Sequence, residues 1–123
     1  MKPIYTPNAP AAIGPYSQGY EAGGFVYTSG QIGVDPATGI APEGIEAQAH
    51  RSCQNVAAVL GAGGTDMRKV FKTTCFLADM ADFAKFNSIY EQYFINKPAR
   101  SCVAVKDLPK GVKVEVEVIA ELK

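Results

Sequence analysis

The chain has 123 residues, of which 47% are hydrophobic and 20% are charged. These proportions predict one domain, spanning residues 1–123, with a modest core. Twelve basic and twelve acidic residues cancel at pH 7, so the charge balance gives no reason to expect a nucleic-acid partner or an anionic membrane partner. No apolar run reaches the length of a signal peptide or a membrane span. Three widely spaced cysteines and a single histidine argue for the reducing cytoplasm and against a zinc site.

The first third of the chain predicts antiparallel strands. Residues 2–6 are expected to form a short edge strand. The runs Tyr16–Tyr20 and Phe25–Ser29 flank Glu21–Gly24, which is the pattern of a β-hairpin. Residues 30–33 continue the second run. Glycines at both of its ends indicate either a bulge or a close approach by a ligand or another backbone, and a simple bend in the strand is the alternative.

After Gly44 the hydrophobic residues recur at spacings of three and four, which predicts an amphipathic helix ending at Gly61 or Gly63. Its apolar positions are Ile45, Ala49, Cys53, Val56 and Leu60. His50 lies beside this stripe and has no second histidine to share a metal ion. We therefore expect a solvated or partly buried histidine rather than a catalytic base.

A third main strand and a second helix are predicted next. Residues 69–77 are rich in Thr, Phe and Val, as strands are. Asp79 then opens a helix, and Asp82 three residues later resembles a capping box. The aromatic stripe of this helix is interpreted as core: Phe83, Phe86, Tyr90, Tyr93 and Phe94.

The last quarter contains two Val-rich runs, residues 98–106 and 112–118, separated by the turn-forming residues 107–111. Alternation places the four valines of the second run on one face. If the two runs pair as a hairpin, Arg100 and Glu115 lie within about three residues of register, or roughly 10 Å. Both could then face one cleft that holds a small anion. Spacing alone favours the alternative, a surface ion pair.

These elements predict an α+β fold, a mixed sheet of five or six strands with two helices on one face. Two helices can cover only one side of such a sheet. The other side is expected to carry Val, Thr and Cys rather than many charges, so we predict that it is covered by another copy of the chain.

Five short motifs, taken together and in this order, resemble the RidA (YjgF-like) family of reactive-intermediate deaminases. The resemblance runs nearly end to end, and the Arg-Ser-Cys-Val run followed by a Glu-bearing strand is its most specific part. It reverses the preference for a surface ion pair. The motifs are Gly14–Gln18, Thr28–Ile32, Pro98–Val103, Leu108–Gly111 and Val114–Val118.

The resemblance implies a chorismate-mutase-like domain that forms a homotrimer, with the sheets in a central barrel and the sites in clefts between subunits. It implies a hydrolase, a 2-iminobutanoate/2-iminopropanoate deaminase, that converts enamines and imines such as 2-aminoacrylate to 2-keto acids and ammonia. Neither a metal nor an organic cofactor is implied. Two other functions stay open: a binder or sensor of small 2-keto acids or amino acids without turnover and, with less support, an endoribonuclease.

The resemblance also implies a role for each matching residue. Arg100 matches the arginine that clamps the substrate carboxylate, for which a planar guanidinium is well suited. Glu115 matches the carboxylate near the attacking water. Cys102 matches a cysteine whose backbone positions that water, although a nucleophilic thiol is the alternative. The remaining matches are Tyr16 and Ser29 as pocket residues, Gly30 as a backbone contact and Asn87 as a pocket edge.

Overall fold

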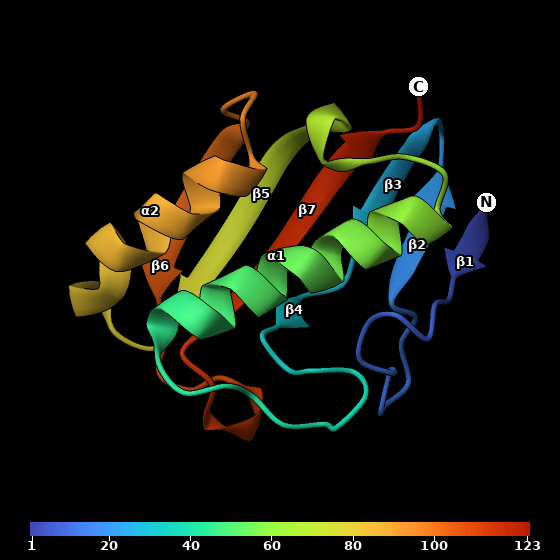
Figure 1. Ribbon diagram of the computed structural model, residues 1–123. Helices are drawn as coiled ribbons and strands as arrows, with labels where there is room; N and C mark the ends of the chain where they lie inside the picture. Colours follow the sequence, from blue (N-terminus) through green and yellow to red (C-terminus); the bar gives the residue numbers. More distant parts are fainter.

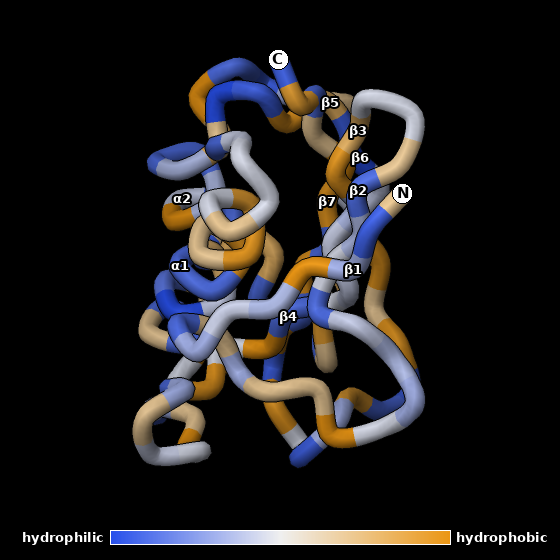
Figure 2. Tube along the Cα trace, turned by 90° about the vertical axis from the view of Figure 1, so that its right-hand side faces the viewer, coloured by the Kyte–Doolittle hydropathy of each residue, from blue (hydrophilic) through white to orange (hydrophobic).

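The computed structural model describes residues 1–123, with two α-helices packed on one face of a seven-stranded mixed sheet (Figure 1). Viewed along the edge of the sheet, the helices lie on one side and the strands on the other (Figure 2). The elements are β1 Lys2–Ile4, β2 Gly19–Ala22, β3 Phe25–Thr28, β4 Gln31–Ile32, α1 Ile45–Ala62, β5 Val70–Leu77, α2 Phe83–Tyr93, β6 Ala99–Ala104 and β7 Val114–Glu121. The predicted α+β class is confirmed. Neither helix is long and apolar enough to cross a membrane.

The strand order is β1-β2-β3-β7-β5-β6, and β4 also pairs with β7. The predicted pairing of the last two strands is wrong, because β5 lies between β6 and β7. The reason is the helix between β5 and β6: a strand, a crossover helix and a strand form a parallel pair. The chain then crosses β5 to place β7 antiparallel at the centre of the sheet.

A β-bulge separates β3 from β4, so the sheet has one strand more than predicted. Both strands pair with β7, yet the chain advances four residues from Tyr27 to Gln31 while β7 advances three from Val116 to Ile119. Such an extra residue bends a strand and redirects its side chains. The bulge that the two glycines indicated is therefore present, and it falls at Ser29 and Gly30.

The core lies between β7 and the helices. Val114, Val116 and Val118 are almost fully buried, as the alternating pattern predicts. Helix α1 also carries buried polar side chains toward the sheet. The Ser52 hydroxyl donates to the Gln31 carbonyl at 2.7 Å, and the Asn55 amide donates to the carbonyls of Ile32 and Val34 at 2.9 Å. Helix α1 thus fixes the position of β4 and of the loop that follows it.

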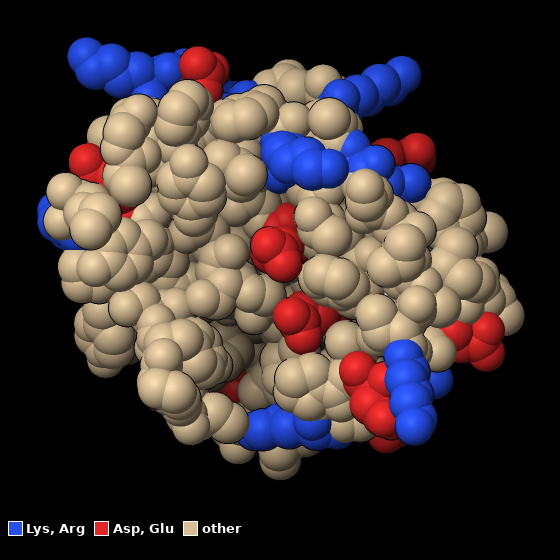
Figure 3. Space-filling model, turned by 180° about the vertical axis from the view of Figure 1, so that it is seen from behind, with Lys and Arg blue, Asp and Glu red and all other residues tan.

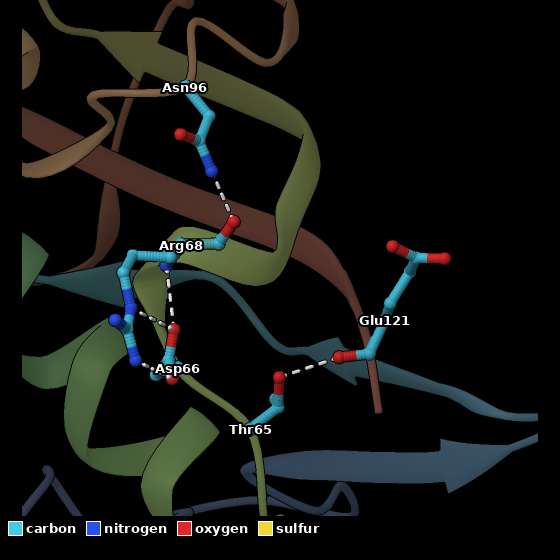
Figure 4. A network of polar contacts seen from close by, with 5 residues as sticks. All are labelled: Thr65, Asp66, Arg68, Asn96 and Glu121. Atoms are coloured by element: carbon cyan, nitrogen blue, oxygen red, sulfur yellow. Dashed lines mark hydrogen bonds and ion pairs between the residues drawn. The ribbon is translucent and has the colours of Figure 1, made fainter. Parts of the chain in front are cut away.

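At the far end of β7, polar contacts join four parts of the chain (Figure 4). The Thr65 hydroxyl donates to the Glu121 carbonyl at 2.6 Å, and the Asp66 carboxylate accepts from the Arg68 backbone N–H at 2.9 Å. The Asn96 amide donates to the Arg68 carbonyl. This corner ties the ends of α1 and β7 to the start of β5 and the segment after α2.

The face of the sheet opposite the helices is largely uncovered. Its exposed apolar side chains are Tyr20, Tyr27, Phe71 and Val103. Figure 3 shows this open face, a mostly uncharged surface with acidic atoms near its middle. The expectation of cysteine on this face is wrong, because Cys75 packs in the core between sheet and helices and Cys102 lies beside it.

Candidate active site

Arg100 lies on β6, opposite Thr73 of β5, and its side chain projects toward α2. Its guanidinium donates a hydrogen bond to the Asn87 side-chain carbonyl at 2.7 Å. The central carbon of the guanidinium lies 4.7 Å from the centroid of the Tyr90 ring and 5.5 Å from that of Phe83. Both distances are within the range of cation–π attraction. Helix α2 therefore holds the guanidinium in a fixed place at the edge of the sheet.

Cys102 lies two residues further along the same strand and on the same face as Arg100. The Val105 N–H donates to the Leu77 carbonyl of β5 at 2.9 Å. Because the backbone groups of successive strand residues alternate in direction, the N–H and carbonyl of Cys102 point away from β5 toward the free edge. The backbone of Cys102 is thus open to a ligand or a water molecule.

The Cys102 thiol has a partner that sequence reasoning missed. Cys75 is its register partner on β5. A hydrogen bond from the Cys75 thiol lowers the pKa of the Cys102 thiol to about 7, although burial opposes the shift, and the positive charge of Arg100 contributes further. His50 is engaged elsewhere, with its ring 2.9 Å from the Tyr93 hydroxyl.

Glu115 lies at the start of β7 and points to the opposite face of the sheet. Its register partners are Phe76 and Ile32, whereas the neighbouring Val116 and Val114 enter the core. Burial, and then the nearby charge of Glu117, raise the pKa of the Glu115 carboxyl above its ordinary value. This carboxyl therefore holds a proton more readily than an exposed glutamate does.

Gly30, at the bulge, has no side chain and so leaves space for the Glu115 carboxylate. A Cβ atom at position 30 would lie 1.9 Å from the Glu115 Oε2 atom, a separation that no side chain can adopt without displacing the carboxylate. The group that approaches Gly30 is thus a side chain of the same chain, and not the ligand or backbone that was expected; a Cβ atom at Gly33, in contrast, would meet the backbone of Gln48.

Tyr16, Ser29, Gly30 and Glu115 line one cavity of about 590 Å³ on this side of the sheet. The Ser29 hydroxyl donates to the Ser17 carbonyl at 2.6 Å, which fixes the hydroxyl oxygen toward the loop. Tyr16 is about half exposed and lies in that loop rather than in a strand, because β2 begins only at Gly19. The predicted hairpin is present, with a shorter first strand.

Gln18 organises the loop that carries Tyr16. Its side-chain oxygen accepts from the Thr6 N–H at 2.7 Å, and its amide donates to the carbonyls of Thr6, Ala9 and Pro10 at 2.9 to 3.3 Å. The side chain is almost fully buried. Gln18 belongs to the motif Gly14–Gln18, but no role was predicted for it. Nothing in the neighbouring sequence indicates that this glutamine is buried.

Comparison with known proteins identifies the family. Residues 6–122 match the family described as endoribonuclease L-PSP. The chain belongs to this family, the RidA (YjgF-like) family. A 2-iminobutanoate/2-iminopropanoate deaminase from Salmonella typhimurium is 52% identical over 123 residues, covering 97% of this chain and 96% of the relative.

Two solved structures of the family are also similar. The YjgF gene product of Escherichia coli has a TM-score of 0.96 and 48% identity, and the match covers 100% of both chains. TdcF of Escherichia coli, solved with bound serine, has a TM-score of 0.95 and 46% identity, and the match covers 98% of both chains. The RidA fold is therefore established for the whole chain.

Within one RidA-family subunit, the candidate residues form two separate groups. The arginine group, Arg100, Asn87 and Cys102, lies on the helix side at the edge of the sheet. The glutamate group, Tyr16, Ser29, Gly30 and Glu115, lines the cavity on the other side. The expectation that Arg100 and Glu115 face one cleft of a single β6–β7 hairpin is wrong, because the two side chains project from opposite faces of the sheet.

Proposed function

We propose that this chain hydrolyses short-lived imines and enamines, such as 2-aminoacrylate, to 2-keto acids and ammonia in the cytoplasm, at sites formed between the subunits of a homotrimer. One observation carries the intersubunit part of the proposal. The residues that match the family's site form two groups on opposite faces of the sheet, and neither group alone can hold a substrate and hydrolyse it. The named activity of relatives about 50% identical supports the reaction itself.

The placement of each group favours assembly. The arginine group sits at the free edge of β6, where its cation faces away from its own sheet. The glutamate group opens onto the uncovered face, next to the exposed Tyr20 and Tyr27. A ring of identical subunits can bring the β6 edge of one copy against the open cavity of the next. Three such contacts would bury the exposed aromatic side chains and complete three sites.

In this proposal Arg100 binds the substrate carboxylate. Its guanidinium is already oriented by Asn87 and by the ring of Tyr90. A planar guanidinium forms two parallel charge-assisted hydrogen bonds to a carboxylate, which fixes both the position and the rotation of a small substrate. TdcF was solved with bound serine, an amino acid whose carboxylate has this chemistry.

Glu115 acts on the water. An iminium carbon is already electrophilic, so hydrolysis requires an oriented water molecule more than a strong base. Glu115 accepts a proton as water adds to the carbon, and it returns a proton to the nitrogen as the C–N bond breaks and ammonia leaves. The raised pKa of this carboxyl suits both steps. The carbonyl of Cys102 and the N–H of Gly30 are the backbone groups we assign to orient the water and the substrate.

The charges around the cavity argue against RNA as the substrate. Its charged lining residues are Asp35, Glu115, Glu117 and Lys110, three acidic groups and one basic group. RNA binding relies on basic side chains that neutralise phosphates. The name endoribonuclease therefore describes the matching family and is not the activity that this cavity favours.

The experiment combines turnover with binding. A dehydratase generates 2-aminoacrylate from serine, and the disappearance of the imine is followed with and without this protein. Glu115→Gln keeps size and hydrogen bonding but removes proton transfer, so we expect turnover to fall by roughly 10²–10⁴-fold. Calorimetric titration with 2-ketobutyrate should give nearly unchanged affinity, because Arg100 supplies that contact.

Glu121→Gln is the matched control, because Glu121 lies on the same strand at the end remote from the cavity. This variant should turn over at the parental rate. Equal turnover of Glu115→Gln and the parent would remove Glu115 from the mechanism. Tight 2-ketobutyrate binding by a parent protein that does not accelerate imine loss would identify the chain as a binder or sensor instead.

A further inference from the structure

Strands β5 and β6 bring two cysteines side by side. Cys75 and Cys102 are register partners in a parallel pair, so their side chains leave the sheet on the same face. Both are free thiols. Cys75 is completely buried, whereas Cys102 is partly exposed. A reagent in solution therefore meets Cys102 first and finds Cys75 directly behind it.

The spacing of the two strands suits a disulfide. Neighbouring strands lie about 4.8 Å apart, and the Cα atoms of disulfide-bonded cysteines usually lie about 4.4–6.8 Å apart. The Cys75 thiol donates a long hydrogen bond of 3.9 Å to the Thr73 hydroxyl on its own strand, a weak contact that it can give up to bond with its register partner Cys102. The register of β5 and β6 is therefore compatible with a disulfide between these two residues.

The two thiols differ in reactivity, and Cys102 is the one expected to react first with an oxidant. The thiolate is the form that attacks an oxidant. Because its pKa is lowered to about 7, Cys102 carries more thiolate at neutral pH than an ordinary cysteine does. The hydrogen bond to Cys102, together with burial, raises the pKa of Cys75, so Cys75 stays protonated until Cys102 has reacted.

We propose that Cys102 and Cys75 form a reversible oxidation site, in which a peroxide oxidises Cys102 and Cys75 resolves the product as an intrachain disulfide. The Cys102 thiolate attacks one peroxide oxygen, the O–O bond breaks, and a sulfenic acid and hydroxide (or alkoxide) form. The Cys75 sulfur then attacks the Cys102 sulfur. The S–O bond breaks, and the oxygen leaves as water with the Cys75 proton. Two thiols lose two electrons in total, and the peroxide gains them.

This oxidation uses the Cys102 sulfur, whereas the deaminase proposal uses the Cys102 backbone, and it needs neither substrate nor turnover. Cys53 provides an internal control within the same chain. It is completely buried in α1, and burial raises its pKa to about 12. Cys53 lacks both features that make Cys102 reactive, an accessible sulfur and a partner that stabilises the thiolate.

The test uses the native protein and hydrogen peroxide. After exposure, the remaining thiols are alkylated in denaturant, and the protein is then digested with trypsin. We expect two of the three cysteines to escape alkylation, a mass loss of two hydrogens, and a linked pair of peptides, residues 73–85 with 101–106. Dithiothreitol should restore all three thiols. Recovery of three alkylated cysteines after peroxide, or disulfide-linked pairs of chains through Cys102 alone, would overturn the proposal.

Two variants separate the roles of the cysteines. Cys53→Ala should form the same linked peptides at the same rate as the parent. In Cys75→Val, Cys102 should stop at the sulfenic acid, which a cyclic 1,3-dione traps as an adduct. The pH midpoint for alkylation of Cys102 should also rise from about 7 toward the ordinary value, because the hydrogen-bond donor is gone. An unchanged midpoint together with no trapped adduct would show that Cys75 plays no part.

Discussion

The arginine group and the glutamate group are built in different ways. Helix α2 fixes Arg100 through two side chains, the Asn87 carbonyl that accepts its hydrogen bond and the ring of Tyr90. Backbone features fix Glu115 instead, a bulge and a glycine that leaves room for its carboxylate. Both charges lack an oppositely charged partner, since the one ion pair in the structure joins Arg68 and Asp66. Each group therefore holds a charged side chain in a fixed position without an opposite charge from its own chain.

The largest expected effect concerns the arginine group. Arg100→Lys keeps the charge but loses the planar pair of donors and the stacking on Tyr90. We expect kcat/KM to fall because transition-state stabilisation decreases by on the order of 2–5 kcal/mol, the range for removing one side of a desolvated charge pair. The coupled imine assay measures it. Activity within twofold of the parent would mean that the arginine group does not contact substrate.

The glutamate group is tested without touching Glu115. Gly30→Ala introduces a Cβ atom that collides with the Glu115 carboxylate, so the carboxylate must move. Displacement of a catalytic group by about 1 Å is expected to lower turnover about 10²-fold. The control is Gly61→Ala in α1, where an added Cβ meets no atom within 4 Å, and turnover should be unchanged. Equal activity of both variants would contradict the proposed role of the bulge.

Cys102 distinguishes a backbone role from a thiol role. Cys102→Ser keeps the backbone at the free edge of β6, so we expect it to retain at least about a tenth of the parental turnover, a smaller loss than one acid/base group contributes. Circular dichroism and light scattering establish that fold and assembly are intact. Complete inactivation of an intact protein would favour the thiol as nucleophile, and mass spectrometry would then detect a covalent adduct.

The smallest expected effect is on stability. Because Glu115 has a raised pKa in the folded chain, the folded state binds this proton more tightly than the unfolded state. The free energy of unfolding attributable to Glu115 therefore falls as the pH rises from the ordinary value of 4.5 through the raised pKa. Glu115→Gln removes this loss, so its Tm should exceed that of the parent by at most a few degrees at pH 7. The difference should disappear near pH 4.

Local patterns in the sequence predicted most of the secondary structure. The spacing of Ile45 to Leu60 matches α1, and the alternating valines match the buried face of β7. The order of the strands was not predictable in the same way, because alternation reports which face of a strand is buried and not which strand lies beside it. The helix between β5 and β6 carried the signal for a parallel pair.

The site residues were found through short motifs, and their arrangement was not. Arg100 and Glu115 are 15 positions apart in the sequence, which suggested one hairpin and one cleft. Their separation onto two faces follows from the position of β5 between β6 and β7. The pairing of Cys75 with Cys102 was missed for the same reason, because it depends on the register of two strands joined by α2.

A subunit-mixing experiment tests the central claim, that each site takes Arg100 from one subunit and Glu115 from another. Arg100→Lys and Glu115→Gln proteins are unfolded, mixed in equal amounts, refolded together and assayed for imine loss. In a randomly mixed ring, about one quarter of the sites combine an intact Arg100 with an intact Glu115 of its neighbour. We therefore expect about one quarter of the activity of parent protein refolded alone, far above either variant refolded by itself. Activity no greater than that of the separate variants would contradict the account.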